Sequence, residues 1–202
     1  MKAVLMSIQP KWVEKIASGE KMIEVRKSRP KLKTPFKVYI YETKGKQVEH
    51  LNGCDITYHG RGKVIGEFVC DKIEELESEF WDDETYESIG VVRYDEDSEE
   101  KEKYIFATNG EGNWLCQKAC LKWEELRKYI GQGINTFYAL NISQLKIYEK
   151  PKEVGKFYVK CTVPESKCKL CDNCYERVDY YGRPYAVKQL KRPPQSWCYV
   201  EK

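Results

Sequence analysis

The sequence has little histidine and no long apolar segment, and both shortages exclude classes of function. Its 202 residues include two histidines, His50 and His59, which are too isolated for us to assign either a role. No Ser-His-Asp arrangement, Walker loop or Rossmann glycine pattern is present. No run approaches the roughly 20 apolar residues that span a bilayer, and the N-terminus reaches Pro10 too soon for a signal peptide. We therefore expect a cytoplasmic protein with no membrane partner.

The composition indicates a folded protein with an uneven distribution of charge. Hydrophobic residues make up 41% of the chain and aromatic residues 13%, and the net charge is +3. Residues 1–65 hold 14 Lys/Arg against 6 Asp/Glu, residues 66–104 hold 4 against 16, and residues 105–202 hold 17 against 10. Two basic stretches around an acidic one suit a protein whose basic face meets phosphate. The alternative reading of the acidic stretch is a solvated helical insert.

The pattern of apolar residues predicts an α+β fold. We expect a helix that starts at Pro10 and ends at Gly19, and a second helix over 121–130 that ends at Gly131. From Asp71 the pattern reads as helical and acidic, and 44–62 reads as a polar loop. Strands are expected over 2–8, 21–27, 36–42, 63–70, 136–148 with a break near Ser143, and the last few residues. Strands at both ends suggest a small mixed barrel whose first and last strands meet.

The octet from Gly19 to Arg26 is the most informative stretch for function. Alternation along a strand puts Glu24 and Arg26 on one face and Ile23 and Val25 on the other. Lys21 falls formally on the other side, although its long stem can swing round the strand edge. Ammonium, carboxylate and guanidinium groups together can grip a polar ligand or shift the pKa of one member. The alternative is a surface ion pair that contributes little.

Other side chains extend this candidate site. Glu67 is a second carboxylate on the polar side of its strand, and Tyr41 and Tyr138 are candidates to stack on a base. Arg29, in a basic loop with Lys31 and Lys33, suits contact with a phosphate.

Nine cysteines in a chain expected to be cytoplasmic indicate thiols or metal ligands rather than disulfides. Cys168, Cys171 and Cys174 form a double C-x-x-C, which predicts a structural zinc knuckle over 161–174 with Cys161 as fourth ligand, or Cys198 in its place. An iron–sulfur cluster and unliganded thiols are the alternatives. Cys116 and Cys120 form either a partial second site or a buried pair on a helix.

Gly19, Lys21, Glu24 and Arg26 reproduce the G-x-K-x-x-E-x-R motif of the ASCH domain family, within the PUA-like superfamily. The runs from Trp123 to Pro151 and from Pro193 to Trp197 resemble the second half of ASCH proteins common in phages and prophages. The resemblance implies one domain over 1–202: a PUA-like mixed β-barrel with flanking helices, a variable insertion at 81–119 and the Cys-rich loop.

The same resemblance implies binding of RNA or a modified nucleotide in a cleft lined by Lys21, Glu24, Arg26, Arg29, Tyr41 and Tyr138. Some small bacterial members resemble this chain in the motif region and hydrolyse N4-acetylcytidine with a lysine and a carboxylate. An amidohydrolase that uses Lys21 with Glu24 or Glu67 is therefore an alternative. The position of Glu24 is a threonine in those hydrolases, which favours recognition over hydrolysis. A phage-derived module for protein interaction is the third hypothesis. The sequence leaves the oligomeric state open.

Overall fold

The computed structural model describes residues 2–80, 87–94, 101–108, 114–161, 174–178, 182 and 184–201. In this part of the chain strands predominate, helices are few and short, and the strands form three sheets. The chain divides into two compact units: unit 1 is Met1–Val13, Phe36–Phe68 and Leu145–Lys202, and unit 2 is Glu14–Pro35 and Val69–Gln144. No helix in the described ranges is long and apolar enough to cross a membrane.

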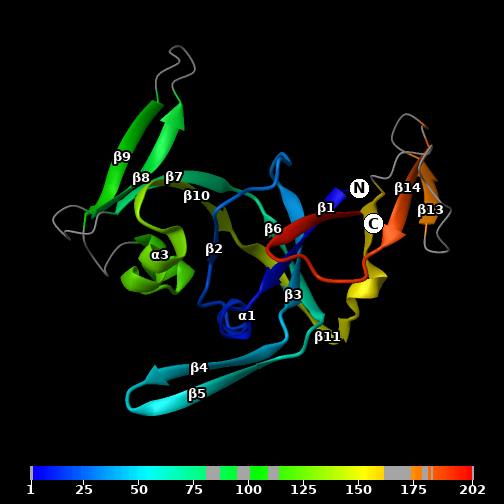
Figure 1. The fold of residues 1–202 in the computed structure, drawn as a ribbon, viewed down its shortest axis with the longest axis horizontal. Coiled ribbons are helices and arrows are strands. Elements are labelled where there is room, and N and C mark those ends of the chain that lie inside the picture. The colour runs from blue at the N-terminus through cyan, green and yellow to red at the C-terminus, as the bar shows by residue number, and fades with distance from the viewer. Residues whose placement is uncertain are drawn as a thin grey trace. The chain divides into compact units, whose positions relative to one another are not determined.

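Unit 1 is built around an eight-stranded sheet with the order β11-β6-β3-β1-β15-β12-β14-β13. In chain order these are β1 (Lys2–Ile8), β3 (Phe36–Glu42), β6 (Val64–Cys70), β11 (Ser143–Lys152), β12 (Tyr158–Lys160), β13 (Cys174–Val178), β14 (Pro184–Gln189) and β15 (Trp197–Glu201), with a 3-10 turn, η1 (Val154–Lys156), before β12. Strand β1 runs parallel to β3 and antiparallel to β15, with Lys2 opposite Glu201. The predicted meeting of the first and last strands is therefore confirmed (Figure 1).

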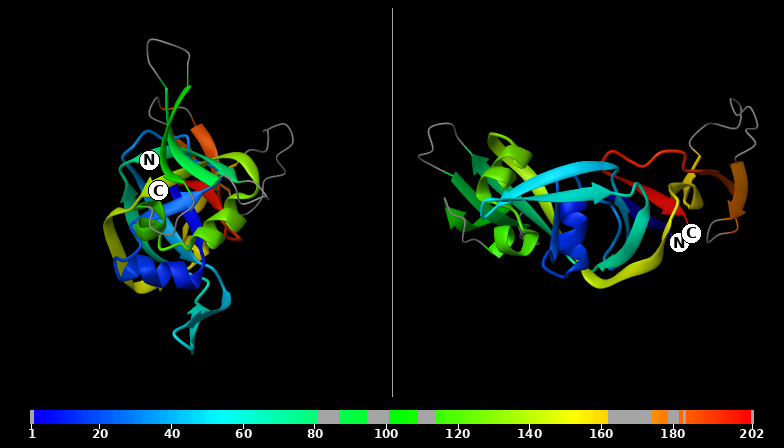
Figure 2. Two further views of the ribbon diagram at one scale, coloured as in Figure 1. Left: turned by 90° about the vertical axis from the view of Figure 1, so that its left-hand side faces the viewer. Right: turned by 90° about the horizontal axis from the view of Figure 1, so that it is seen from below.

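A two-stranded hairpin, β4 (Gly45–Leu51) and β5 (Cys54–Gly60), extends away from the eight-stranded sheet (Figures 1 and 2). The expectation of a loop over 44–62 is wrong here. Asn52 and Gly53 form the turn with φ of 50° and 78°, and an Asn-Gly pair with two positive φ angles is the favoured two-residue hairpin turn. The sequence did not predict these strands because most of their residues are polar and exposed, so they lack the apolar pattern of a buried strand.

Unit 2 contains a five-stranded sheet with the order β2-β10-β7-β8-β9. Its strands are β2 (Ile23–Arg26), β7 (Ile73–Phe80), β8 (Glu87–Tyr94), β9 (Lys101–Thr108) and β10 (Gly133–Asn141). The helical reading from Asp71 onward is wrong, because this stretch supplies β7, β8 and β9. In β7, Leu76, Ser78 and Phe80 are buried while the glutamates between them are half-exposed. This period of two is a strand pattern, but the two intervening glutamates favour helices and made the stretch look helical.

In the described ranges three α-helices accompany the strands: α1 (Pro10–Ala17), α2 (Trp114–Ala119) and α3 (Trp123–Ile130). Gly19 and Gly131 follow α1 and α3 with φ of 82° and 100°, so the predicted helices and their glycine stops are confirmed. The expected closed barrel is not formed by the described strands, whose sheets are open. The physical reason is that β2 pairs with β10, and the stretch expected to be a helical insert adds β7, β8 and β9 to that sheet.

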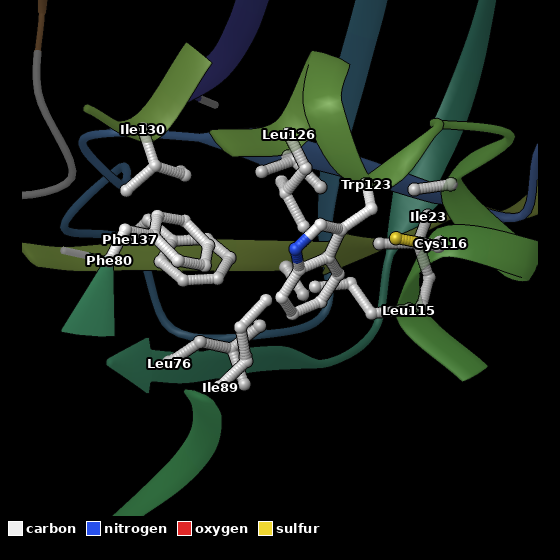
Figure 3. Packing of buried hydrophobic residues seen from close by; sticks show 13 residues of the cluster. Ile23, Leu76, Phe80, Ile89, Leu115, Cys116, Trp123, Leu126, Ile130 and Phe137 are labelled. Atoms are coloured by element: carbon white, nitrogen blue, oxygen red, sulfur yellow. The ribbon is translucent and has the colours of Figure 1, made fainter. Parts of the chain in front are cut away.

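The core of unit 2 lies between α3 and one face of the five-stranded sheet. Trp123 opens α3 and packs against Phe80 of β7, with ring centroids 5.5 Å apart in an edge-to-face arrangement. Figure 3 shows the indole beside the rings of Phe80 and Phe137. The cluster also contains Ile23 and Val25 from β2. The buried side of β2 is thereby fixed, and the other side of the strand is left to Glu24 and Arg26.

Replacing Trp123 by Ala should therefore lower the free energy of unfolding by about 3–5 kcal/mol, because a large buried ring is lost and the cavity cannot fully collapse. Urea unfolding followed by circular dichroism measures the change. Ile134→Ala is the control, because Ile134 is 61% exposed and its loss should change stability by less than about 0.5 kcal/mol. Equal effects of the two substitutions would contradict this view of the core.

Candidate ligand site on strand β2

The site begins where the C-terminus of α2 meets the segment that leads into β2. A helix leaves its last four carbonyl groups without partners inside the helix. Two of them, on Cys116 and Gln117, accept the N–H groups of Leu121 and Cys120 at 3.0 and 3.2 Å, which is the Schellman pattern. The carbonyl of Lys118 accepts the N–H of Met22 at 2.8 Å.

The fourth carbonyl, on Ala119, binds the side chain of Lys21. The Nζ of Lys21 donates a hydrogen bond to it at 2.7 Å. A cation is stabilised at this end of a helix because the helix dipole is negative there. The carbonyl of Met22 in turn accepts the N–H of Ile142 at 2.9 Å, so the segment is held on both sides. Together these bonds direct the Lys21 side chain into the protein.

Lys21, Glu24 and Arg26 form one buried charged group. Lys21 Nζ lies 3.4 Å from Glu24 Oε2, and Arg26 Nη2 lies 3.0 Å from Glu24 Oε1. Lys21 is 3% exposed and Glu24 is 6% exposed. Glu24 and Arg26 share a face of β2, as the alternation indicated, and Lys21 reaches them. The group carries one excess positive charge while Lys21 is protonated and none when it is neutral.

Burial changes the acid–base behaviour of Lys21. Removal of its ammonium group from water lowers the pKa of Lys21, and this effect outweighs the attraction of Glu24, which acts to raise it. A lysine in such a place has more of the neutral amine near neutral pH than an exposed lysine does. The arrangement can therefore hold an anion or accept a proton, depending on the protonation state of Lys21.

Tyr138 and Arg29 adjoin this group. Tyr138 lies directly opposite Arg26 in the antiparallel pair of β10 and β2. Directly opposite residues on paired strands point to the same face of the sheet. The guanidinium of Arg29 lies 5.8 Å from the centroid of the Tyr138 ring, within the range of a cation–π contact. Five of the predicted site residues, Lys21, Glu24, Arg26, Arg29 and Tyr138, thus gather in unit 2.

The other two predicted site residues, Glu67 and Tyr41, belong to unit 1. Glu67 accepts a hydrogen bond from Lys37 Nζ at 2.5 Å and one from the hydroxyl of Tyr148 at 2.5 Å. Burial alone would raise the pKa of Glu67, but these bonds outweigh it and the pKa is lowered. Tyr41 is 5% exposed, and burial raises its pKa. Glu67 is thus a carboxylate with both oxygens bonded, and Tyr41 is a core ring.

The predicted zinc ligands fall largely outside the described residues. Cys168 and Cys171 are not described, and Cys174 is described only by the backbone of β13. Cys161 is a half-buried free thiol. Burial raises the pKa of Cys198 to about 11, which disfavours the thiolate that binds zinc. Among the described residues, no three His, Cys, Asp or Glu side chains are grouped so that they could hold a metal ion. The zinc knuckle over 161–174 stays a prediction.

The structure decides between the two readings of the other cysteine pair, Cys116 and Cys120, for Cys116 alone. Cys116 is buried on α2 and belongs to the core of unit 2, as the helix alternative proposed. Cys120 follows the helix with φ of 53°, at the position that glycine usually takes in the Schellman pattern.

Sequence reasoning missed the backbone partner of Lys21 and the side-chain partners of Glu67. Nothing in the sequence marks the carbonyl of Ala119, because every residue has a carbonyl and only the end of α2 frees this one. The sequence gives only a weak signal for Lys37 and Tyr148, since each lies in a predicted strand. The strand pairing that brings them to Glu67 was not available from the sequence.

The lowered pKa of Lys21 predicts a pH dependence of stability. The unfolded chain binds a proton at Lys21 up to the ordinary pKa of 10.5, whereas the folded chain releases it earlier. Folding stability should therefore rise with pH between the lowered pKa and 10.5, relative to a Lys21→Met variant. Denaturant unfolding at a series of pH values measures the difference.

The matched control for this measurement is Lys128→Met, which removes an exposed lysine of α3. Its difference from the wild type should stay constant over the same pH range. A difference for Lys21→Met that is flat, or that falls as the pH rises, would contradict the assignment.

Comparison with known proteins identifies the family of this chain. A model described as the ASCH domain matches residues 6–116, more than half of the chain. A crystal structure of ASCH from Zymomonas mobilis is similar at 16% identity and a TM-score of 0.49, covering 99% of this chain and 88% of that one. A mutant of the same protein is similar at 15% identity and a TM-score of 0.49, with 99% and 89% covered. No curated protein matches the sequence. The match over residues 6–116 shows that the chain belongs to the ASCH domain family.

Proposed function

We propose that this ASCH domain binds single-stranded RNA or a modified nucleotide through Lys21, Glu24, Arg26, Arg29 and Tyr138. One observation supports the proposal most strongly. The buried charged group of Lys21, Glu24 and Arg26 lies beside the half-buried ring of Tyr138, and Arg26 and Tyr138 share a face of the paired strands β2 and β10. Proteins that bind single-stranded nucleic acid combine these elements: cations for the phosphates and aromatic rings on which bases stack. Tyr41 is left out because a base needs an accessible ring face.

The charges of the site favour a ligand with both an anionic group and hydrogen-bond donors. Lys21 and Arg26 supply the excess positive charge. Glu24 Oε2 is buried and faces Lys21 Nζ at 3.4 Å, longer than a good hydrogen bond, so it retains capacity for a further donor. A carboxylate oxygen can accept more than one hydrogen bond, so a ligand N–H or O–H can bind here beside Lys21. A nucleotide offers a phosphate and donors in one molecule.

Binding to a labelled single-stranded RNA, measured by fluorescence anisotropy at several salt concentrations, tests the proposal. Arg29→Gln should weaken binding and reduce the slope of log K against log salt by about 1 if one phosphate contact is lost. Tyr138→Ala should weaken binding by about 1–3 kcal/mol, the usual contribution of one stacked base, and leave the slope unchanged.

Arg192→Gln is the matched control, because it makes the same change of charge at an exposed position of unit 1. It should leave affinity nearly unchanged. RNA affinity that survives both site substitutions, or that does not fall with salt, would rule out this function.

The lowered pKa of Lys21 favours one second candidate, an amidohydrolase acting on an N4-acylated cytidine. Neutral Lys21 would take a proton from water as the water oxygen adds to the acyl carbon. The C–N bond would then break, with the proton passed to the leaving amino group. The products are cytidine and a carboxylic acid. Glu24, 3.4 Å from Lys21 Nζ, is placed to stabilise the protonated amine.

Incubation of the purified protein with N4-acetylcytidine, followed by chromatography, tests this second candidate. An active enzyme should release cytidine, and Lys21→Met should lower the rate by at least about a hundredfold, the usual contribution of a general base. Thermal unfolding of the variant shows whether it is folded. Cytidine release no faster than in buffer alone would exclude the activity.

A further inference from the structure

A row of three side chains crosses the face of the five-stranded sheet that carries the site. Tyr138 of β10 has Arg26 of β2 directly opposite on one side and Glu75 of β7 directly opposite on the other. Residues opposite one another in antiparallel strands lie on the same face. Neighbouring strands are about 4.8 Å apart, so Arg26 and Glu75 start about 10 Å apart with the tyrosine ring between them.

This row is accessible at its middle. Along β10 the same face passes from Leu140, which is fully buried, through half-buried Tyr138 to exposed Thr136. Glu75 is also half-buried. Tyr138 and Glu75 are therefore both partly exposed on this face of the sheet, and Arg26 lies opposite Tyr138 on the other side.

The row has opposite charges at its two ends. Arg26 stands on one side of Tyr138, and the guanidinium of Arg29 lies 5.8 Å from the same ring. Glu75 stands on the other side, and Glu77 follows it opposite Thr136. A base stacked on Tyr138 thus meets donors along one edge and carboxylate acceptors along another.

Among the four RNA bases, guanine matches this polarity. Its N7 and O6 are adjacent acceptors, the pair that arginine binds most often. Its N1–H and N2–H₂ are adjacent donors, which two carboxylate oxygens can accept together. Cytosine and adenine each place an amino group beside an acceptor nitrogen, and uracil places one N–H between two carbonyl groups, so each would set an acceptor against the carboxylate.

We propose that Glu75 makes the site selective for guanine, by accepting the N1–H and N2–H₂ groups of a base stacked on Tyr138. This inference rests on the proposed RNA-binding function. Glu75 is a specificity-determining residue at the edge of the site, whereas Lys21, Glu24 and Arg26 hold the rest of the ligand.

The experiment measures anisotropy with a set of short oligouridine RNAs whose central nucleotide is guanosine, adenosine, cytidine, uridine or inosine. The wild type should bind the guanosine RNA about tenfold more tightly than the other four, in line with one good bidentate contact. Inosine, which lacks only the N2 amino group, isolates the contact with the carboxylate without any change to the protein.

Glu75→Gln should reduce the preference for guanosine over inosine to less than about twofold, because the amide offers one acceptor where guanine needs two. Glu74→Gln is the matched control. It removes the same charge one residue away, at a side chain that lies opposite Ala139 on the other face and bonds Lys72 Nζ at 2.6 Å. This control should keep the full preference for guanosine.

The outcomes separate the two proposals. Salt-dependent RNA binding that falls in Tyr138→Ala but shows no preference for guanosine over inosine would overturn the guanine assignment and leave the RNA-binding function in place. Retention of the preference by Glu75→Gln would do the same. Absence of RNA binding by the wild type would overturn both.

Discussion

The burial of one ammonium group is the constraint on which the site depends. At 3% exposure, the charge on Lys21 must be met by protein groups, because water no longer solvates it. The groups that meet it come from two distant parts of the chain, the end of α2 through the carbonyl of Ala119 and β2 through Glu24. Satisfying Lys21 therefore requires that α2, the turn after Gly19 and β2 all be in place. The same requirement orients Glu24, which in turn holds Arg26.

The two candidate functions use the same geometry with different protonation states. A protonated Lys21 leaves the group with one positive charge, which suits a phosphate, and Glu24 then serves as a hydrogen-bond acceptor. A neutral Lys21 is a base beside a carboxylate, which suits hydrolysis of an amide. Desolvation and the attraction of Glu24 act on the pKa of Lys21 in opposite directions, and their balance sets how much of the lysine is protonated at a given pH.

The sequence predicted those features that depend on local pattern. Alternation along β2 placed Glu24 and Arg26 together, and the glycines after α1 and α3 marked the helix ends. The sequence did not predict β4, β5 and β7 as strands, because polar residues hid the alternation of buried and exposed positions. A closed barrel was predicted because the sequence does not show that β2 pairs with β10. The carbonyl that binds Lys21 also depends on tertiary structure. Any role of Glu67 as a catalyst, and the zinc knuckle, stay predictions.

The pairing of β1 with β15 has a consequence for the order in which the chain folds. Strand β1 lies inside the eight-stranded sheet, yet one of its two neighbours is contributed by residues Trp197–Glu201. The hydroxyl of Ser7 likewise donates to the carbonyl of Pro194, 187 positions away. Contacts of such long range form slowly, because a large loop must close first. Unit 2 is complete at Gln144, so during synthesis it can fold while β1 still exposes one edge and awaits the last strand.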